Sequence, residues 1–179
     1  MMLRRRDPSQ SSTRQAASGA PAEETVRLVV FSLDGLRLAV PLASVSRVVR
    51  AVAVTPLPHG PDAILGAVDV AGTLVPVHDL RRRFGLPARP VAPEAQMILG
   101  HTTARPMALV VERVEGVVER PARELVPPDQ VAPGMRYVAG VVRLGEGIVF
   151  IHDLDAFLAP DEESTLASAL QAAGAVGPS

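Results

Sequence analysis

Residues 66–86 read GAVDVAGTLVPVHDLRRRFGL, and residues 140–160 read GVVRLGEGIVFIHDLDAFLAP. The two stretches share their first glycine, two valines and a consecutive His-Asp-Leu, where composition alone would give about two matches. In each stretch, aliphatic runs flank a central glycine-containing turn, which is the pattern of a β-hairpin. The sequence therefore predicts a β unit that occurs twice.

The similarity continues upstream of both stretches. Residues 38–49 (LAVPLASVSRVV) align with residues 107–118 (MALVVERVEGVV), and residues 28–30 align with residues 97–99. Two repeats are too few for an open solenoid, so we expect two small, similar β-barrels packed together with a seam between them. The expected unit spans 26–160 and consists of two interleaved barrels, with halves of roughly 26–90 and 95–160.

Short runs of Val, Leu and Ile bounded by Gly, Pro and Asp predict strands rather than long helices. In the first half, Asp34-Gly35 is a strong hairpin signal, and a proline-rich loop is expected over 55–61. The five expected strands, which would fit one small barrel, are 26–33, 36–41, 44–54, 64–70 and 73–78. The predicted fold class is mostly β, with two pseudo-symmetric five-stranded barrels and a short C-terminal helix.

The two ends of the chain differ from this pattern. Residues 1–25 are expected to form a disordered tail, and they contain no apolar run typical of a signal peptide. Residues 161–179 begin with three acidic residues and continue with apolar residues at helical spacing up to Gly174, which predicts a short helix that covers barrel surface. No stretch approaches the roughly 18 apolar residues of a membrane span, so no membrane insertion is expected.

The composition excludes several kinds of chemistry. The 179 residues include no Cys and no Lys, and all 18 basic residues are Arg, which rules out thiol nucleophiles, thiolate metal sites, Schiff bases and a phosphate-binding lysine. The net charge is −1, only 3% of residues are aromatic and Trp is absent, so a small barrel that binds nucleic acid is disfavoured. The absence of Cys suits a reducing cytoplasm.

Two His-Asp pairs, His78-Asp79 and His152-Asp153, are the residues that most resemble a catalytic or metal-binding site. An enzyme or metal site built from them would need both pairs in one cavity. Consecutive strand residues point to opposite faces, however, so each His diverges from its Asp, and a structural role is favoured. We expect Asp79 and Asp153 to cap the turns that follow them. No catalytic residue, cofactor or metal is predicted.

The first half carries a long motif in residues 55–85, from TPLP through ILGAVDVAGTLVPVHDLRRRFG, which resembles the signature stretch of the CheW family of chemotaxis coupling proteins. The similarity also covers FSLDG and LAVP near the start, and ALVVERVEGVV and YVAGV in the second half, so it extends over roughly 26–160. The chain is identified as a suspected member of that family.

The resemblance implies two SH3-like barrels with a hydrophobic seam and no enzymatic activity. Its members are cytoplasmic adaptors, recruited to membrane receptor arrays, that link the helical hairpin tip of a chemoreceptor to the regulatory domain of the histidine kinase CheA. Carried over by position, the partner-facing residues are Leu42, Val45, Arg47 and Val48 on one barrel and Ala108 and Val114 near the seam on the other. Strand alternation places Val45 and Arg47 on one face.

The sequence departs from the family pattern at three places. A turn usually written Asn-Leu-Arg-Gly is DVAG here, so Ala71 replaces an Arg that the resemblance would assign to partner contacts. Arg47 replaces an acidic residue, and Glu112-Arg113 replaces an Asp-Gly turn. These changes favour partners from a separate chemosensory pathway that controls pili, gliding or another output. The alternative is a CheW-like scaffold that docks into another complex without signalling.

Overall fold

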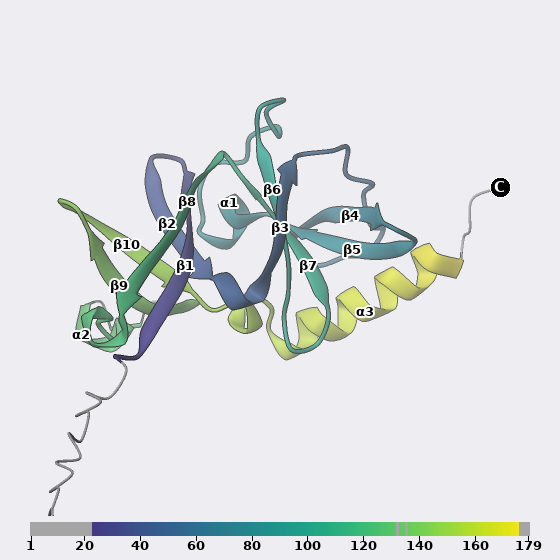
Figure 1. Ribbon diagram of the computed structural model, residues 1–179. Coiled ribbons are helices and arrows are strands. Elements are labelled where there is room, and N and C mark those ends of the chain that lie inside the picture. Colours follow the sequence, from purple (N-terminus) through teal and green to yellow (C-terminus); the bar gives the residue numbers. More distant parts are fainter. Residues whose placement is uncertain (1–22, 132, 135, 176–179) are drawn as a thin grey trace, which may run out of the picture.

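The computed structural model describes residues 23–131, 133–134 and 136–175, and in this part of the chain ten strands form two five-stranded sheets (Figure 1). The sheet that contains β1 has the order β8-β1-β2-β10-β9, and we call it the β1 barrel. The other has the order β3-β6-β7-β5-β4 and is called the β3 barrel. The predicted fold class is confirmed. The expected disordered tail falls largely on residues 1–22, outside the described residues.

The elements follow one another in two similar series. The strands of the β1 barrel are β1 (Thr25–Leu33), β2 (Leu36–Pro41), β8 (Arg113–Pro121), β9 (Val138–Leu144) and β10 (Gly147–His152). Those of the β3 barrel are β3 (Val45–Arg50), β4 (Ile64–Val70), β5 (Thr73–His78), β6 (Gln96–His101) and β7 (Pro106–Val111). The helices are α1 (Leu80–Arg83), α2 (Pro128–Val131) and α3 (Pro160–Ala175), with 3₁₀ turns η1 (Leu42–Ser44), η2 (Ala122–Glu124) and η3 (Leu154–Ala156).

The strands of one half do not form one barrel, so the expectation that the first five strands close a barrel is wrong. The β1 barrel combines β1 and β2 of the first half with β8, β9 and β10 of the second, and the β3 barrel is made in the reverse way. Each half therefore contributes its first hairpin to one barrel and its last three strands to the other. Strand pairing between barrel-forming segments is specified by long-range contacts, which local sequence patterns do not report.

The internal repeat extends to the register of the strands. Val45 lies opposite Gly100 in the β3 barrel, and its counterpart Val114 lies opposite Phe31 in the β1 barrel. The parallel pairs are equivalent in the same way, with Val77 beside Ala108 in one barrel and Ile151 beside Ala39 in the other. The two barrels are thus related by a pseudo-twofold operation that exchanges the halves of the chain.

Several local predictions are confirmed. The Asp34-Gly35 turn has positive φ at both residues, 53° and 76°, as a tight hairpin turn requires. The second predicted hairpin, over 64–70 and 73–78, has the expected bounds. The strand expected over 44–54 is shorter, because β3 ends at Arg50 opposite the first residue of β6, and Val52 beyond it is exposed.

The apolar residues form three cores. Each barrel encloses a small one, such as Leu28 and Val30 in the β1 barrel and Val75 and Val77 in the β3 barrel. The largest core lies between the barrels and is built by both sheets together with the turns that follow β5 and β10; it contains Phe31, Leu38, Leu80, Ile98, Met107, Leu109, Leu154 and Phe157. We call it the shared core. Because β1 is buried on both faces, its apolar run is continuous rather than alternating.

Helix α3 packs against β5 of the β3 barrel and runs along that side of the molecule (Figure 1). Leu166 and Ala169 are buried on the side of the helix that makes this contact. The charged first turn is held by the ion pairs Arg83–Glu162 and Arg105–Glu163. The predicted covering helix is therefore present. Gly174 lies inside the helix rather than beyond it, since α3 extends to Ala175. In the described residues, no helix is both long and apolar enough to cross a membrane.

Candidate functional site

The strands β3 and β8 each form one of the two edges of their sheet and are equivalent in the internal repeat. From each strand one valine packs against the shared core: Val45 from β3 and Val114 from β8. Two residue pairs further along each ladder, Val48 and Val117 remain exposed, at 38% and 52%. We call these four valines the seam surface.

A β-bulge shapes each of these strands. Val45 and Arg47 lie opposite the consecutive residues Gly100 and Leu99, so Ser46 is the extra residue of the bulge. Consecutive residues of β6 face opposite ways, and Val45 and Arg47 therefore lie on opposite faces. The expectation that they share a face is wrong, because uninterrupted alternation does not hold across a bulge.

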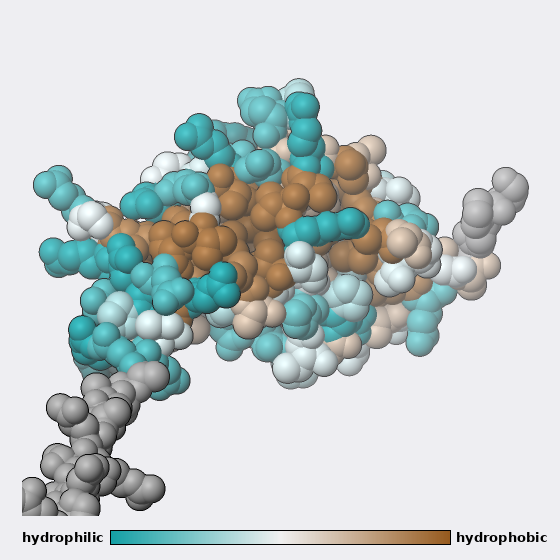
Figure 2. All heavy atoms as spheres, in the orientation of Figure 1, coloured by the Kyte–Doolittle hydropathy of each residue, from teal (hydrophilic) through white to brown (hydrophobic). Residues whose placement is uncertain are grey.

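The bulge instead puts Val48 on the same face as Val45. Val48 lies directly opposite Ile98, a residue of the shared core, and Val117 lies directly opposite Val29, another residue of that core. Figure 2 shows hydrophobic residues forming a band across the face on which β8, β1 and β3 lie in Figure 1, bordered by hydrophilic ones. The seam surface thus continues the shared core out to solvent.

Charged side chains lie on both strands that carry the seam surface. Arg50 is exposed on the same face of β3 as Val48, Arg47 is exposed on the other face of that strand, and Arg113 is exposed on β8. The bulge residue of β8, Glu115, is held by Arg37, whose Nη2 lies 2.7 Å from the Glu115 Oε2. An apolar strip with a polar rim is the usual anatomy of a protein-binding surface.

The remaining predicted contact residues lie elsewhere. Leu42 is half-buried in η1 and packs against the shared core, and Ala71 is exposed at the β4–β5 turn with φ of 52°. Ala108 is completely buried inside the β3 barrel, so its side chain cannot face a partner, which corrects that prediction. The exchange of strands between the halves also corrects the assignment of these residues to barrels. The residues of β3 lie in the same barrel as β4–β7, and Val114 lies in the same barrel as β1.

Sequence reasoning missed a second apolar surface, on the outer side of the β1 barrel. Val126, Val131 and Ile148 are each at least 39% exposed and line one groove together with Val141 and Arg143. We call Val126, Val131 and Ile148 the outer patch. The sequence signal for this surface was Ile148, an isoleucine at an outward-facing strand position. Its counterpart in the repeat, Leu74, lies beside Gly174 of α3. Only the second half of the chain is followed by such a helix.

Both histidines of the His-Asp pairs are buried beside the ring of Phe157. The ring centroid of His78 lies 6.4 Å from that of Phe157, and the centroid of His152 lies 5.9 Å from it. The pKa of each histidine is lowered from 6.5 to about 4; burial is the main cause for both, and at His78 the charges of Arg83 and Arg105 contribute to the same lowering. Neutral imidazoles in a hydrophobic core act as packing groups. Among the described residues, no group of three or more His, Asp or Glu side chains could hold a metal ion.

The two aspartates cap the turns as predicted. The Asp79 Oδ1 accepts the backbone N–H of Arg81 at 2.9 Å and that of Arg82 at 3.3 Å, at the start of α1. The Asp153 Oδ1 accepts the N–H of Asp155 at 2.9 Å, at the start of η3. The structural interpretation of Asp79 and Asp153 is confirmed.

Replacing Asp79 with alanine should lower the free energy of unfolding by about 1–2 kcal/mol, because two backbone donors of α1 lose their acceptor. The matched variant Asp153→Ala removes one such bond and should cost about half as much. Urea unfolding followed by circular dichroism measures both. A larger loss for Asp153→Ala than for Asp79→Ala would contradict the assignment.

Comparisons with known proteins agree with this architecture. The family model described as a CheW-like domain matches residues 27–162. Protein FrzA of Myxococcus xanthus is 32% identical over 113 residues, which cover 63% of this chain and 69% of that protein. The chemotaxis protein CheW of Rhizobium meliloti (strain 1021) is 23% identical over 138 residues, covering 76% of this chain and 88% of that protein.

A solved structure is also similar. The scaffolding protein TtCheW of Thermoanaerobacter tengcongensis superimposes with a TM-score of 0.71 at 25% sequence identity. The match covers 78% of this chain and 96% of that chain.

Proposed function

The chain belongs to the CheW family, and from this premise we propose that it is a non-catalytic adaptor that couples chemoreceptors to a CheA-type histidine kinase. It would work in the cytoplasm and be recruited to receptor arrays, with residues 26–160 as the functional unit. The observation that carries the proposal is the seam surface, where the exposed Val48 and Val117 extend the shared core. A receptor tip is a helical hairpin, and an apolar helix face fits such a strip.

An adaptor needs separate places for its two partners. The seam surface and the outer patch share no residue and are formed by different strands: β3 and β8 carry the first, while β10 and the segment before β9 carry the second. We assign the receptor hairpin to the seam surface and the kinase regulatory domain to the outer patch. Binding both at once fixes their relative geometry, and receptor state can then change kinase activity through differential contacts.

The charges on β3 point to partners of a separate chemosensory pathway. Arg47 is exposed on the face of β3 opposite Val45 and Val48, and Ala71 at its exposed turn offers no charge. A partner with acidic residues facing Arg47 would complement its charge, whereas a partner with basic residues there would be repelled.

Replacing Val48 with glutamate should weaken binding of the cognate receptor hairpin at least about tenfold, because a charge would be buried in the apolar contact. Kinase regulatory domain binding should stay within about twofold. Ile148→Glu is the matched variant, with the opposite pattern expected. Both side chains are substantially exposed, at 38% and 51%, so neither change disturbs a core.

Pull-down and titration of both variants against the two partners measure this pattern. Undiminished receptor binding by Val48→Glu would remove the seam surface from the receptor contact. Failure of the unmodified protein to bind either partner would instead favour a scaffold of another complex.

A further inference from the structure

The apolar part of the seam surface has the symmetry of the internal repeat. The pseudo-twofold operation exchanges β3 with β8, and it therefore exchanges Val45 with Val114 and Val48 with Val117. A helix that lies along such a strip makes equivalent apolar contacts in either of two opposite directions. The four valines provide a place for a helix but do not select its direction.

Two charged residues, Arg50 and Glu119, extend this symmetric strip. Arg50 lies two residues beyond Val48 on β3, and Glu119 lies two residues beyond Val117 on β8, with no bulge in between. Each charged residue is therefore on the same face as the valine that precedes it. Both side chains are exposed, so a helix that contacts the valines also reaches these charges.

Arg50 and Glu119 stand at opposite ends of the seam surface. Arg50 lies opposite Gln96, and the Gln96 Oε1 accepts the N–H of Val114 at 2.6 Å, so the end of β3 adjoins the start of β8. Glu119, the repeat counterpart of Arg50, lies opposite Arg27, and by the same symmetry it adjoins the start of β3. The two strands accordingly run in opposite directions (Figure 1). The symmetric valines are thus flanked by unlike charges.

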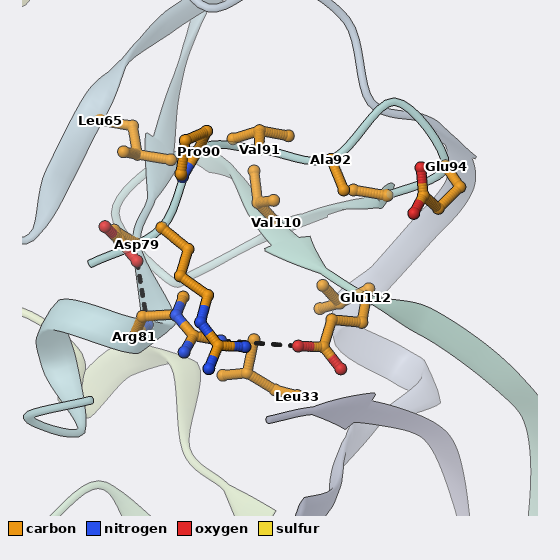
Figure 3. A pocket seen from close by; sticks show the side chains of 13 residues that line it. Leu33, Leu65, Asp79, Arg81, Pro90, Val91, Ala92, Glu94, Val110 and Glu112 are labelled. Atoms are coloured by element: carbon orange, nitrogen blue, oxygen red, sulfur yellow. Dashed lines mark hydrogen bonds and ion pairs between the residues drawn. The ribbon is translucent and has the colours of Figure 1, made fainter. Parts of the chain in front are cut away.

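The charge of Arg50 is not compensated from within the described part of the chain, where Arg50 makes no ion pair. Glu112, the acidic residue just before β8, instead faces Arg81 across the cavity of Figure 3, with 3.5 Å between its Oε1 and the Arg81 Nη1.

At the opposite end, Glu119 has a weak partner. The Arg27 Nε lies 3.9 Å from its Oε2, and both side chains are at least 60% exposed. Such an exposed pair contributes little and rearranges easily when a partner offers a better contact. On the seam face of β3, β6, β8 and β1, one end therefore carries the positive charge of Arg50, and the other end carries a loosely balanced pair.

We propose that Arg50 and Glu119 set the direction in which a partner helix lies on the seam surface, with the acidic end of the helix at Arg50 and its basic end at Glu119. This inference rests on the proposed function, in which that helix belongs to the receptor hairpin. Complementary charges fix the orientation of a complex, and like charges brought together exclude the reversed one.

The length of the strip also specifies the spacing of the charges on the helix. From Val45 to Arg50, the ladder with β6 advances from Gly100 to Gln96, which is roughly 13 Å of strand. An α-helix rises about 5.4 Å per turn, so the acidic and basic side chains should lie roughly two to three turns apart, on the edge of its apolar stripe.

Two synthetic helical peptides of equal composition serve as probes, each about 18 residues long with one apolar stripe and blocked ends. The first carries glutamate in its first turn and arginine in its last turn, and the second has these two exchanged. Each carries a nitroxide at its N-terminus and is titrated into the full chain labelled for NMR. The first peptide should broaden the amide signal of Arg50 at least about fivefold more than that of Glu119, and the second should do the reverse.

Variants of the chain test the same assignment from the protein side. The double variant Arg50→Glu with Glu119→Arg exchanges the charges and should reverse the direction of both peptides. The matched control Arg47→Glu changes a charge on the other face of β3 and should leave both directions as they were. All three side chains are exposed, so each variant should fold normally.

The inference and the proposed function fail in different ways. Saturable binding in which both peptides lie in the same direction, or in which the double variant leaves the directions unchanged, would overturn the role of Arg50 and Glu119 alone. Absence of saturable binding by both peptides would overturn the seam surface as a helix-binding site and the proposed receptor contact with it. Seam signals that change with protein concentration alone would overturn both as well, because the occupant would then be a second copy of the chain.

Discussion

Replacing Phe157 with alanine should lower the free energy of unfolding by about 3–5 kcal/mol. Phe157 is 1% exposed, belongs to the shared core and has the rings of Phe84, Tyr137 and both buried histidines within 6.4 Å between centroids. Truncation removes a large apolar group and leaves a cavity whose walls come from both halves of the chain. Urea unfolding followed by circular dichroism and by Tyr137 fluorescence measures the loss.

The same variant tests whether the barrels unfold together. Because the shared core is the largest and is built by both sheets, we expect one cooperative transition in Phe157→Ala, as in the unmodified protein. The control Ile148→Ala changes a half-exposed side chain and should shift stability by no more than about 0.5 kcal/mol. Two separate transitions, or a loss below about 1 kcal/mol for Phe157→Ala, would contradict the central role of this core.

Lowering the pH from 7 to 5 should cost about 3–4 kcal/mol of stability. His78 and His152 have folded pKa values of about 4, against 6.5 as the ordinary value. The unfolded chain therefore binds more protons than the folded chain below pH 6.5, and stability falls as the pH drops from there towards 4. Each histidine accounts for about 2 kcal/mol over this interval.

The surroundings of the two histidines explain why both pKa values are lowered. Desolvation is the main cause for both, and Arg83 and Arg105 add a repulsive field at His78. At His152 the Nδ1 lies 3.0 Å from the carbonyl oxygen of Tyr137, which opposes the shift without cancelling it. The pKa values of Asp34 and Asp155 lie below the ordinary value of 3.8. The stability that these carboxylates contribute is therefore lost only as the pH falls through that value and below it, and they do not affect the change in stability between pH 7 and 5.

His78→Leu separates the two contributions. Among the described residues the His78 side chain makes no hydrogen bond, so leucine should preserve the packing and remove about half of the pH dependence. The exposed His59 supplies the control, His59→Asn, which should leave the pH dependence unchanged. Urea unfolding at pH 7 and pH 5 measures all three proteins. An unchanged slope in His78→Leu would contradict the assignment of a neutral, buried imidazole.

The candidate site was only partly predictable. Val45, Val48 and Val114 were predicted from the family resemblance alone, and in the structure all three belong to the seam surface. Arg47 was assigned to the wrong face and Ala108 to the surface, because a bulge changes the facing of every later residue and a strand buried on both faces gives no outward position. The outer patch was missed, because whether an outward isoleucine is covered depends on where a distant helix packs.

By itself, the sequence determined what is local or repeated: the hairpins at Asp34-Gly35 and residues 64–78, the caps at Asp79 and Asp153, the duplication and the mostly β class. These follow from turn geometry and hydrophobic spacing, which act over a few residues. Only the tertiary structure decided which strands share a barrel, because both halves present the same edges and can pair within or between themselves. The exchange between halves is what puts Phe31, Ile98 and Phe157 into one shared core and brings β3 and β8 to its rim.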